Sequence, residues 1–171
     1  MTEVLAKTFA DFVLPASVVT KIDVSRLVTE LERVDNDLTT AAVRAEKGGP
    51  AVAAPVLSQQ MTDFLTQNQL NIENSKDRMD LIKQLRLLKD AVPIIHMTFA
   101  VTADPESLQQ LALWLRTTIN PQAVIAVGLQ PSLVAGVYLR TPNHVHDLSL
   151  RAMLKNGRGL LVEELGALRG R

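Results

Sequence analysis

The chain has 171 residues, of which 47% are apolar and 4% aromatic, and its 18 basic residues balance its 18 acidic ones. This length allows one medium domain or two small ones. The balanced charge excludes a general attraction to nucleic acid or to anionic lipid. The absence of cysteine excludes disulfides, thiolate zinc sites and cysteine nucleophiles. No run of about 18 consecutive apolar residues is present, and acidic residues precede any long apolar stretch, so we expect a cytoplasmic protein without a signal peptide.

Residues 1–92 are expected to be helical. Asp23 or Ser25 can cap a first helix, which Lys47-Gly48-Gly49-Pro50 ends, and an Ala/Pro loop then runs to Pro55. Its apolar positions recur at spacings of three and four, as in a long helix packed along one seam: Leu27, Leu31, Val34, Leu38 and Ala41.

Two further helices follow in this half. The second is expected to turn Val56, Leu57, Met61, Phe64 and Leu65 inward. The third begins near Asn74 or Ser75 and is expected to bury Met79, Leu81, Ile82, Leu85 and Leu88. These patterns predict a helical bundle with no catalytic site of its own.

Residues 93–156 change to a mixed pattern after a boundary near Val92-Pro93. Alternating apolar residues predict a strand from 95 to 101, and Asp104-Pro105-Glu106 opens a helix that stops at Asn120-Pro121. This helix is expected to bury Leu108, Leu111, Ala112, Leu115 and Ile119. Strands at 123–129 and 133–140 are expected to pair as a hairpin, followed by a helix opened by Asp147. The predicted fold class is therefore α+β, a helical bundle followed by a small strand-helix-strand-strand-helix domain.

The segment from Pro131 to Arg151 carries polar residues at fixed offsets. Pro131-Ser132 closes a turn, Gly136 interrupts an alternating strand, and Asp147-x-Ser149-x-Arg151 begins a helix. A glycine in mid-strand leaves room for something to come close. This pattern resembles the C-terminal signature of the delta subunit of rotary ATP synthases, the family of the mitochondrial oligomycin-sensitivity protein.

The resemblance implies a non-catalytic stator subunit at the cytoplasmic face of the cell membrane, with no cofactor and no nucleic acid. Its partners would be the alpha subunits of the catalytic head and the b-type subunits of the peripheral stalk, and it would meet the membrane only through the complex. Residues 1–92, shorter than the six-helix bundle of that family, are then the head-docking candidate, 93–156 the stalk-binding candidate and 157–171 a tail. The expected interface residues are Gly136, Asp147, Ser149, Arg151, Leu161 and Leu165.

Two other readings remain open. An E-type peripheral-stalk subunit of a vacuolar-type ATPase also has long helices before a small α+β domain. The third reading is a small regulatory or ligand-binding α+β domain, although no nucleophile elbow, Gly-rich phosphate loop or Ser-His-Asp set is visible.

The histidines, Asp147 and Trp114 each have a structural explanation. His144 and His146 would point to one side of an extended segment, but a metal needs more ligands and His96 is the only other histidine, so solvated histidines are expected. Asp147 is expected to be a helix N-cap that pairs with Arg151 or Arg140. Trp114 is assigned to the edge of the core, with a partner contact as the alternative.

Overall fold

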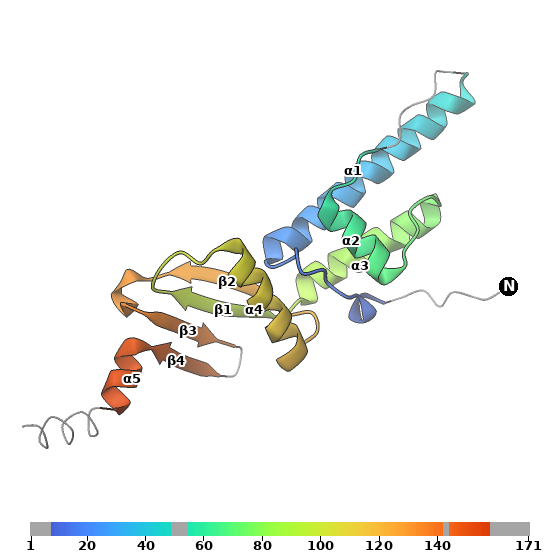
Figure 1. The fold of residues 1–171 in the computed structure, drawn as a ribbon. Helices are drawn as coiled ribbons and strands as arrows, with labels where there is room; N and C mark the ends of the chain where they lie inside the picture. The colour runs from blue at the N-terminus through green and yellow to red at the C-terminus, as the bar shows by residue number, and fades with distance from the viewer. Residues whose placement is uncertain (1–7, 49–54, 142–143, 158–171) are drawn as a thin grey trace, which may run out of the picture. The chain divides into compact units, whose positions relative to one another are not determined.

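A computed structural model describes residues 8–48, 55–141 and 144–157. The chain forms two compact units: Met1–Pro93 with Gln109–Val124, and Ile94–Leu108 with Ile125–Arg171. Helices make up most of the first unit and a four-stranded sheet most of the second (Figure 1). The predicted α+β class is therefore confirmed.

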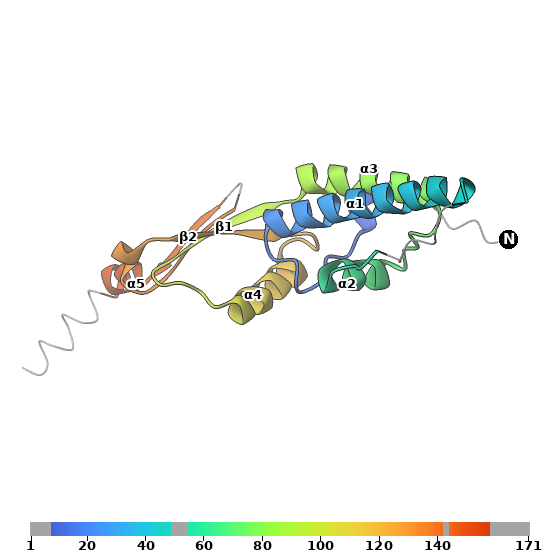
Figure 2. The ribbon, with the colours of Figure 1, turned by 90° about the horizontal axis from the view of Figure 1, so that it is seen from above.

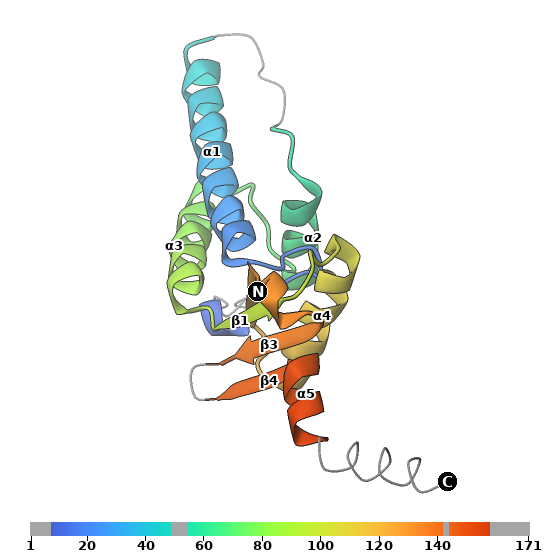
Figure 3. The same ribbon diagram turned by 90° about the vertical axis from the view of Figure 1, so that its left-hand side faces the viewer.

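Three helices make the body of the first unit: α1 (Lys21–Glu46), α2 (Gln59–Asn68) and α3 (Ser75–Ala91). Helices α1 and α3 pack side by side, and α2 lies on the side of α1 that faces away from α3 (Figures 2 and 3). The cap of α1 is Thr20, not Asp23 or Ser25. Thr20 Oγ1 accepts a bond from the Asp23 amide, and the Asp23 carboxylate accepts the Thr20 amide at 2.8 Å. This reciprocal capping box starts the helix earlier than expected.

Most of the predicted core positions are buried, including Leu27, Leu31, Met61, Phe64, Ile82, Leu85 and Leu88. Two of the core positions predicted in this half are wrong. Val56 is 83% exposed because it precedes α2 and does not share its helical period. Met79 is about half exposed because Arg78 occupies the buried stripe of α3 and pairs with Asp35 at 2.7 Å.

The second unit is built on a sheet in the order β2-β1-β3-β4 (Figure 1). Its strands are β1 (Ile94–Phe99), β2 (Val124–Leu129), β3 (Gly136–Arg140) and β4 (Val145–Ser149). Strand β2 runs parallel to β1, because Val124 N donates to Pro93 O at one end and Gln130 N to Phe99 O at the other, with a constant offset. The β1–β3 and β3–β4 pairs are antiparallel.

The predicted hairpin between β2 and β3 is therefore wrong, because β1 lies between them. Helix α4 (Pro105–Thr118), capped by Asp104 as expected, connects β1 to β2 in a strand-helix-strand crossover. This crossover places β2 on one side of β1 and leaves the other side for β3. Of the residues assigned to the buried face of α4, Ala112 and Leu115 are buried, whereas Ile119, just beyond the helix, is about half exposed.

The secondary structure around Asp147 differs from the prediction. Asp147 lies in β4, a strand that the sequence did not indicate, and helix α5 (Leu150–Asn156) begins three residues later. Its N-cap is Ser149, whose Oγ accepts the Ala152 amide at 3.2 Å. Asp147 instead accepts the Ser149 amide at 3.0 Å. Among the described residues, no helix has both the length and the apolar character needed to cross a membrane.

Candidate docking surfaces

Gly136 lies where the start of β3 meets the end of β4. Its φ is +94°, and a Cβ built there would lie 2.3 Å from Leu148 O and 2.8 Å from Ser149 Cα. The close approach that the sequence suggested is therefore made by the chain's own backbone. A bulky residue at this position would therefore disturb the fold itself, whether or not a partner also lies near Gly136.

Asp147, Ser149 and Arg151 surround the same junction. Ser149 is buried and serves as the cap of α5, so it is not available to a partner. Asp147 and Arg151 are exposed and line an open groove of about 620 Å³ with Tyr138 and Lys155. Hydrogen bonds from the Ser149 side chain and amide lower the pKa of Asp147, and the charge of Arg151 lowers it further.

One line of apolar side chains crosses the sheet of the second unit. Phe99 pairs with Val137, and Val137 pairs with Leu148, so the three lie on one face. The hydrogen bond from Gln130 N to Phe99 O places Leu129 opposite Phe99 on that face. Leu129 is 58% exposed and Leu148 55%, while Phe99 and Val137 are half-buried.

We call these four residues the apolar row. Four strands span about 14 Å across a sheet, a distance comparable to two to three turns of an α-helix. The row thus offers a helix a contact surface at i, i+3/i+4 and i+7 positions.

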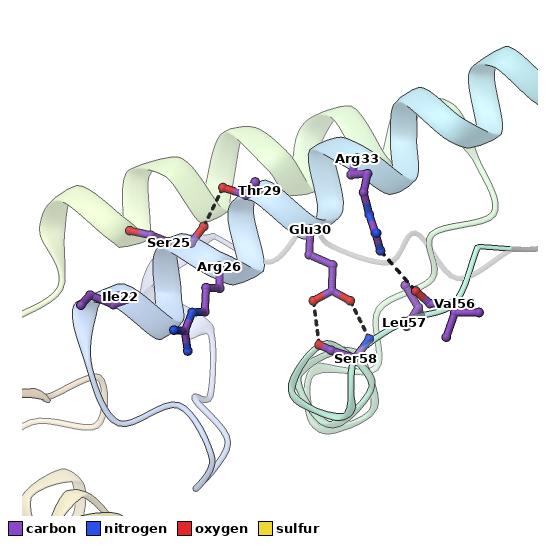
Figure 4. A pocket seen from close by; sticks show the side chains of 9 residues that line it. All are labelled: Ile22, Ser25, Arg26, Thr29, Glu30, Arg33, Val56, Leu57 and Ser58. Carbon is purple, nitrogen blue, oxygen red and sulfur yellow. Dashed lines mark hydrogen bonds between the residues drawn. The ribbon is translucent and has the colours of Figure 1, made fainter.

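A second surface lies between α1 and α2 in the first unit (Figure 4). This α1–α2 groove has a volume of about 600 Å³ and is lined by Ile22, Ser25, Arg26, Thr29, Glu30, Arg33, Val56, Leu57 and Ser58. Glu30 accepts the amide and hydroxyl of Ser58, both at 2.6 Å, so its charge is already engaged. Arg33 Nη2 donates to Val56 O at 3.4 Å. The groove thus presents exposed apolar side chains beside Arg33 and Arg26, of which Arg26 is ion-paired with Asp23 at 3.3 Å.

The histidines do not converge. His144 and His146 have ring centroids 6.2 Å apart, but His96 pairs with Arg140 and His146 with Leu139, on opposite faces of the sheet. Among the described residues, no three or more metal-ligating side chains lie close enough to hold an ion.

Three further residues, Trp114, Leu161 and Leu165, are candidate partner contacts. Trp114 is 54% exposed, so its assignment to the core is wrong, and a partner contact stays a prediction. Leu161 and Leu165 lie outside the described residues.

Sequence reasoning missed Arg116, which is buried on the inner side of α4. It donates from Nε to Ala123 O at 3.1 Å, and from Nη1 to Leu14 O at 3.1 Å and Pro15 O at 2.8 Å; Nη2 donates to Val18 O. Burial lowers its pKa to about 10. No acidic side chain of the described residues forms an ion pair with it. Its position four residues after Ala112, on the apolar stripe, was the signal available in the sequence.

The chain matches no protein-family model, and no curated protein matches it either.

Proposed function

We propose that this protein is a non-catalytic delta-type subunit of the peripheral stalk of a proton-translocating ATP synthase. The observation that carries the proposal is the mutual dependence of the Pro131–Arg151 residues. Gly136 permits β3 to touch the end of β4 at Leu148–Ser149, and Ser149 caps the helix that carries Arg151. The residues of the Pro131–Arg151 pattern therefore depend on one another in the fold, and this supports the resemblance more than unconnected identities would.

Two surfaces, one on each unit, support the proposed mechanical role. A stator subunit holds the static head against rotor torque by burying apolar area on two partners, and it needs no bond chemistry. The α1–α2 groove is the candidate surface for the head, because its cations and apolar ends suit an amphipathic segment with acidic residues. The apolar row is the candidate surface for a stalk helix.

Co-purification tests the assignment. A tagged full-length chain, expressed in its source cells, should recover head alpha subunits and b-type stalk subunits from detergent-solubilised membranes, and should show no ATPase activity of its own. Recovery of vacuolar-type stalk subunits would support the E-type reading instead. Recovery of neither set, or ATP hydrolysis by the isolated chain, would overturn the proposal.

Point variants test the apolar row. Leu129→Asp and Leu148→Asp should each weaken binding of b-type stalk helices by about 10- to 100-fold, the scale of an interface anchor. Val101→Asp is the matched control, because Val101 is 71% exposed in the same unit but lies off the row. If all three variants bind like the parent, the stalk surface lies elsewhere, and Leu165→Asp tests the tail next.

A further inference from the structure

The segment Thr8–Val19, which we call the strap, runs along the first unit before α1. Its only helical part is the 3-10 turn Phe9–Asp11, and Phe12 after it is extended. Side chains of other elements bind the strap through its backbone, as a protein binds an extended peptide. Besides the Arg116 contacts, the bonds are Phe9 N to Gln84 Oε1 (2.9 Å), Gln122 Nε2 to Phe9 O (2.6 Å) and Phe12 O (3.0 Å), and Gln60 Nε2 to Ser17 O (2.7 Å).

Asn68, at the end of α2, makes the most specific of these contacts. Its Oδ1 accepts the Val13 amide at 2.8 Å and its Nδ2 donates to Val13 O at 2.9 Å. The amide side chain thereby satisfies both backbone groups of one residue, as a neighbouring strand would do. Asn68 is fully buried, so this recognition takes place in the interior of the unit.

Apolar side chains of the strap alternate in the manner of a bound peptide. Phe12 and Leu14 are buried, while Val13 between them is 55% exposed. The Phe12 ring packs edge-on against Phe64 of α2, with ring centroids 5.4 Å apart. The site therefore combines a pocket for an aromatic ring with polar side chains that form hydrogen bonds with backbone atoms of the strap.

The charged guanidinium of Arg116 also binds the strap. Three of its four acceptors are strap carbonyls, at Leu14, Pro15 and Val18. Burying a guanidinium that has no carboxylate partner costs free energy unless other acceptors take its hydrogen bonds. The strap carbonyls supply those acceptors, so the site is more stable with a strap bound than without one.

We propose that the strap is an intramolecular peptide ligand, and that the site it fills accepts the same segment from a second copy of the chain. The strap joins α1 at Thr20, which the capping box with Asp23 holds at the start of the helix, so the cap stays with α1 when the strap is exchanged. Exchange of an identical element costs little, because every contact is remade in the partner. Within one chain the tether keeps the local concentration high, so exchange requires high protein concentration or a weakened strap. This inference does not depend on the proposed function.

A peptide in trans tests the site. Phe12→Ala in the full chain weakens the strap and leaves the site intact, and Val13→Ala is the matched control with an exposed side chain. A synthetic peptide of residues 8–20 at about 1 mM should raise the melting midpoint of the Phe12→Ala chain by about 5 °C. It should also move the Asn68 side-chain NMR signals toward their parent positions. The parent and the Val13→Ala chain should not respond, because their own straps fill the site.

The same measurements can overturn the proposal. A folded Phe12→Ala chain whose midpoint and Asn68 signals ignore the peptide excludes a peptide site. An equal response to a peptide carrying Phe12→Ala excludes it as well, because the aromatic pocket would then be irrelevant. If Phe12→Ala prevents folding, Leu14→Ala takes its place under the same criteria.

Mixing two full-length variants tests the second copy. Asn68→Ala carries an intact strap and a weakened site, and Phe12→Ala carries the reverse. Hydrogen exchange of the strap amides first shows whether each substitution releases the strap of its own chain, because docked straps would give mixing no gain in contacts. With both straps released, the mixture gains one intact strap in one intact site and should form a heterodimer by light scattering after gel filtration, whereas each chain alone stays monomeric at the same concentration. If the mixture stays monomeric at millimolar concentration while the peptide binds, the exchange between copies is refuted.

Discussion

Replacing Arg116 by methionine would test whether carbonyl oxygens alone can sustain a buried cation. Methionine fills a similar volume and keeps the helix propensity of α4, so the change removes mainly the charge and the donors. Four backbone carbonyls, at Leu14, Pro15, Val18 and Ala123, would lose a charged donor.

The expected loss follows from two opposing terms. Hydrogen bonds from a charged group contribute about 1.5 kcal/mol each at the lower end, so the four together contribute about 6 kcal/mol. Burial of the guanidinium opposes this. The fall of its pKa from 12.5 to about 10 corresponds to about 3 kcal/mol, and to somewhat less after allowance for partial solvent screening. Arg116→Met should therefore destabilise the first unit by about 3 kcal/mol.

Urea denaturation followed by circular dichroism measures the total loss, and hydrogen exchange resolved by residue assigns it to the first unit. The strap amides should exchange fastest, because they lose their anchor first. Arg116→Lys is the control: it keeps the charge but has fewer donors on a narrower head group, so about half of the loss is expected. A methionine variant as stable as the parent, with strap amides still protected, would refute the reasoning, because the burial cost would then cancel the carbonyl bonds.

Three further outcomes are expected. Gly136→Ala should destabilise the second unit by about 3 kcal/mol or more, whereas Gly48→Ala, at a φ of +71° with nothing within 4 Å of its Cβ, should cost only about 1 kcal/mol; equal losses would mean that the contact with Leu148 O is not tight. Asn68→Ala should cost about 2–3 kcal/mol and speed hydrogen exchange at the Val13 amide, and unchanged protection there would contradict the assigned bond. Hydrogen bonds from Ser107 lower the pKa of Asp104, so its stabilising effect is present above the unfolded value near 3.8 and is lost as pH falls through the lower folded value. Asp104→Asn should remove that part of the acid dependence, and an acid unfolding curve identical to that of the parent would count against it.

Periodicity predicted the elements that bury one regular face. Helix α3 and strand β1 bury side chains at spacings of three to four and of two, and both were found near their expected bounds. Strand β4 was missed because only its last residue, Ser149, is buried, so it shows no apolar alternation. A strand of this kind is held by pairing with β3, and pairing partners cannot be read from local sequence.

The two errors at the sheet have the same origin. Proximity in the sequence favoured a hairpin between β2 and β3, but β1, some thirty residues before β2, pairs with both. The Asp-x-Ser-x-Arg pattern predicted a cap of the correct kind at the wrong residue, because either Asp147 or Ser149 can cap and only the end of β4 decides between them. Arg116 and Asn68 were not singled out because their partners are backbone atoms, most of them in the strap, and backbone atoms carry no sequence signature.

The placement of two aromatic residues gives each unit its own optical signal. Trp114 is the only tryptophan of the chain and lies in the first unit, half exposed, while the only tyrosine, Tyr138, lies in the sheet of the second unit. Tryptophan fluorescence excited selectively therefore reports on the helical unit, and tyrosine absorbance reports on the sheet, without any label. A bulky partner seated over Trp114 would shift its emission to shorter wavelength and shield it from a soluble quencher, so this one indole can distinguish docking on α4 from docking on the sheet.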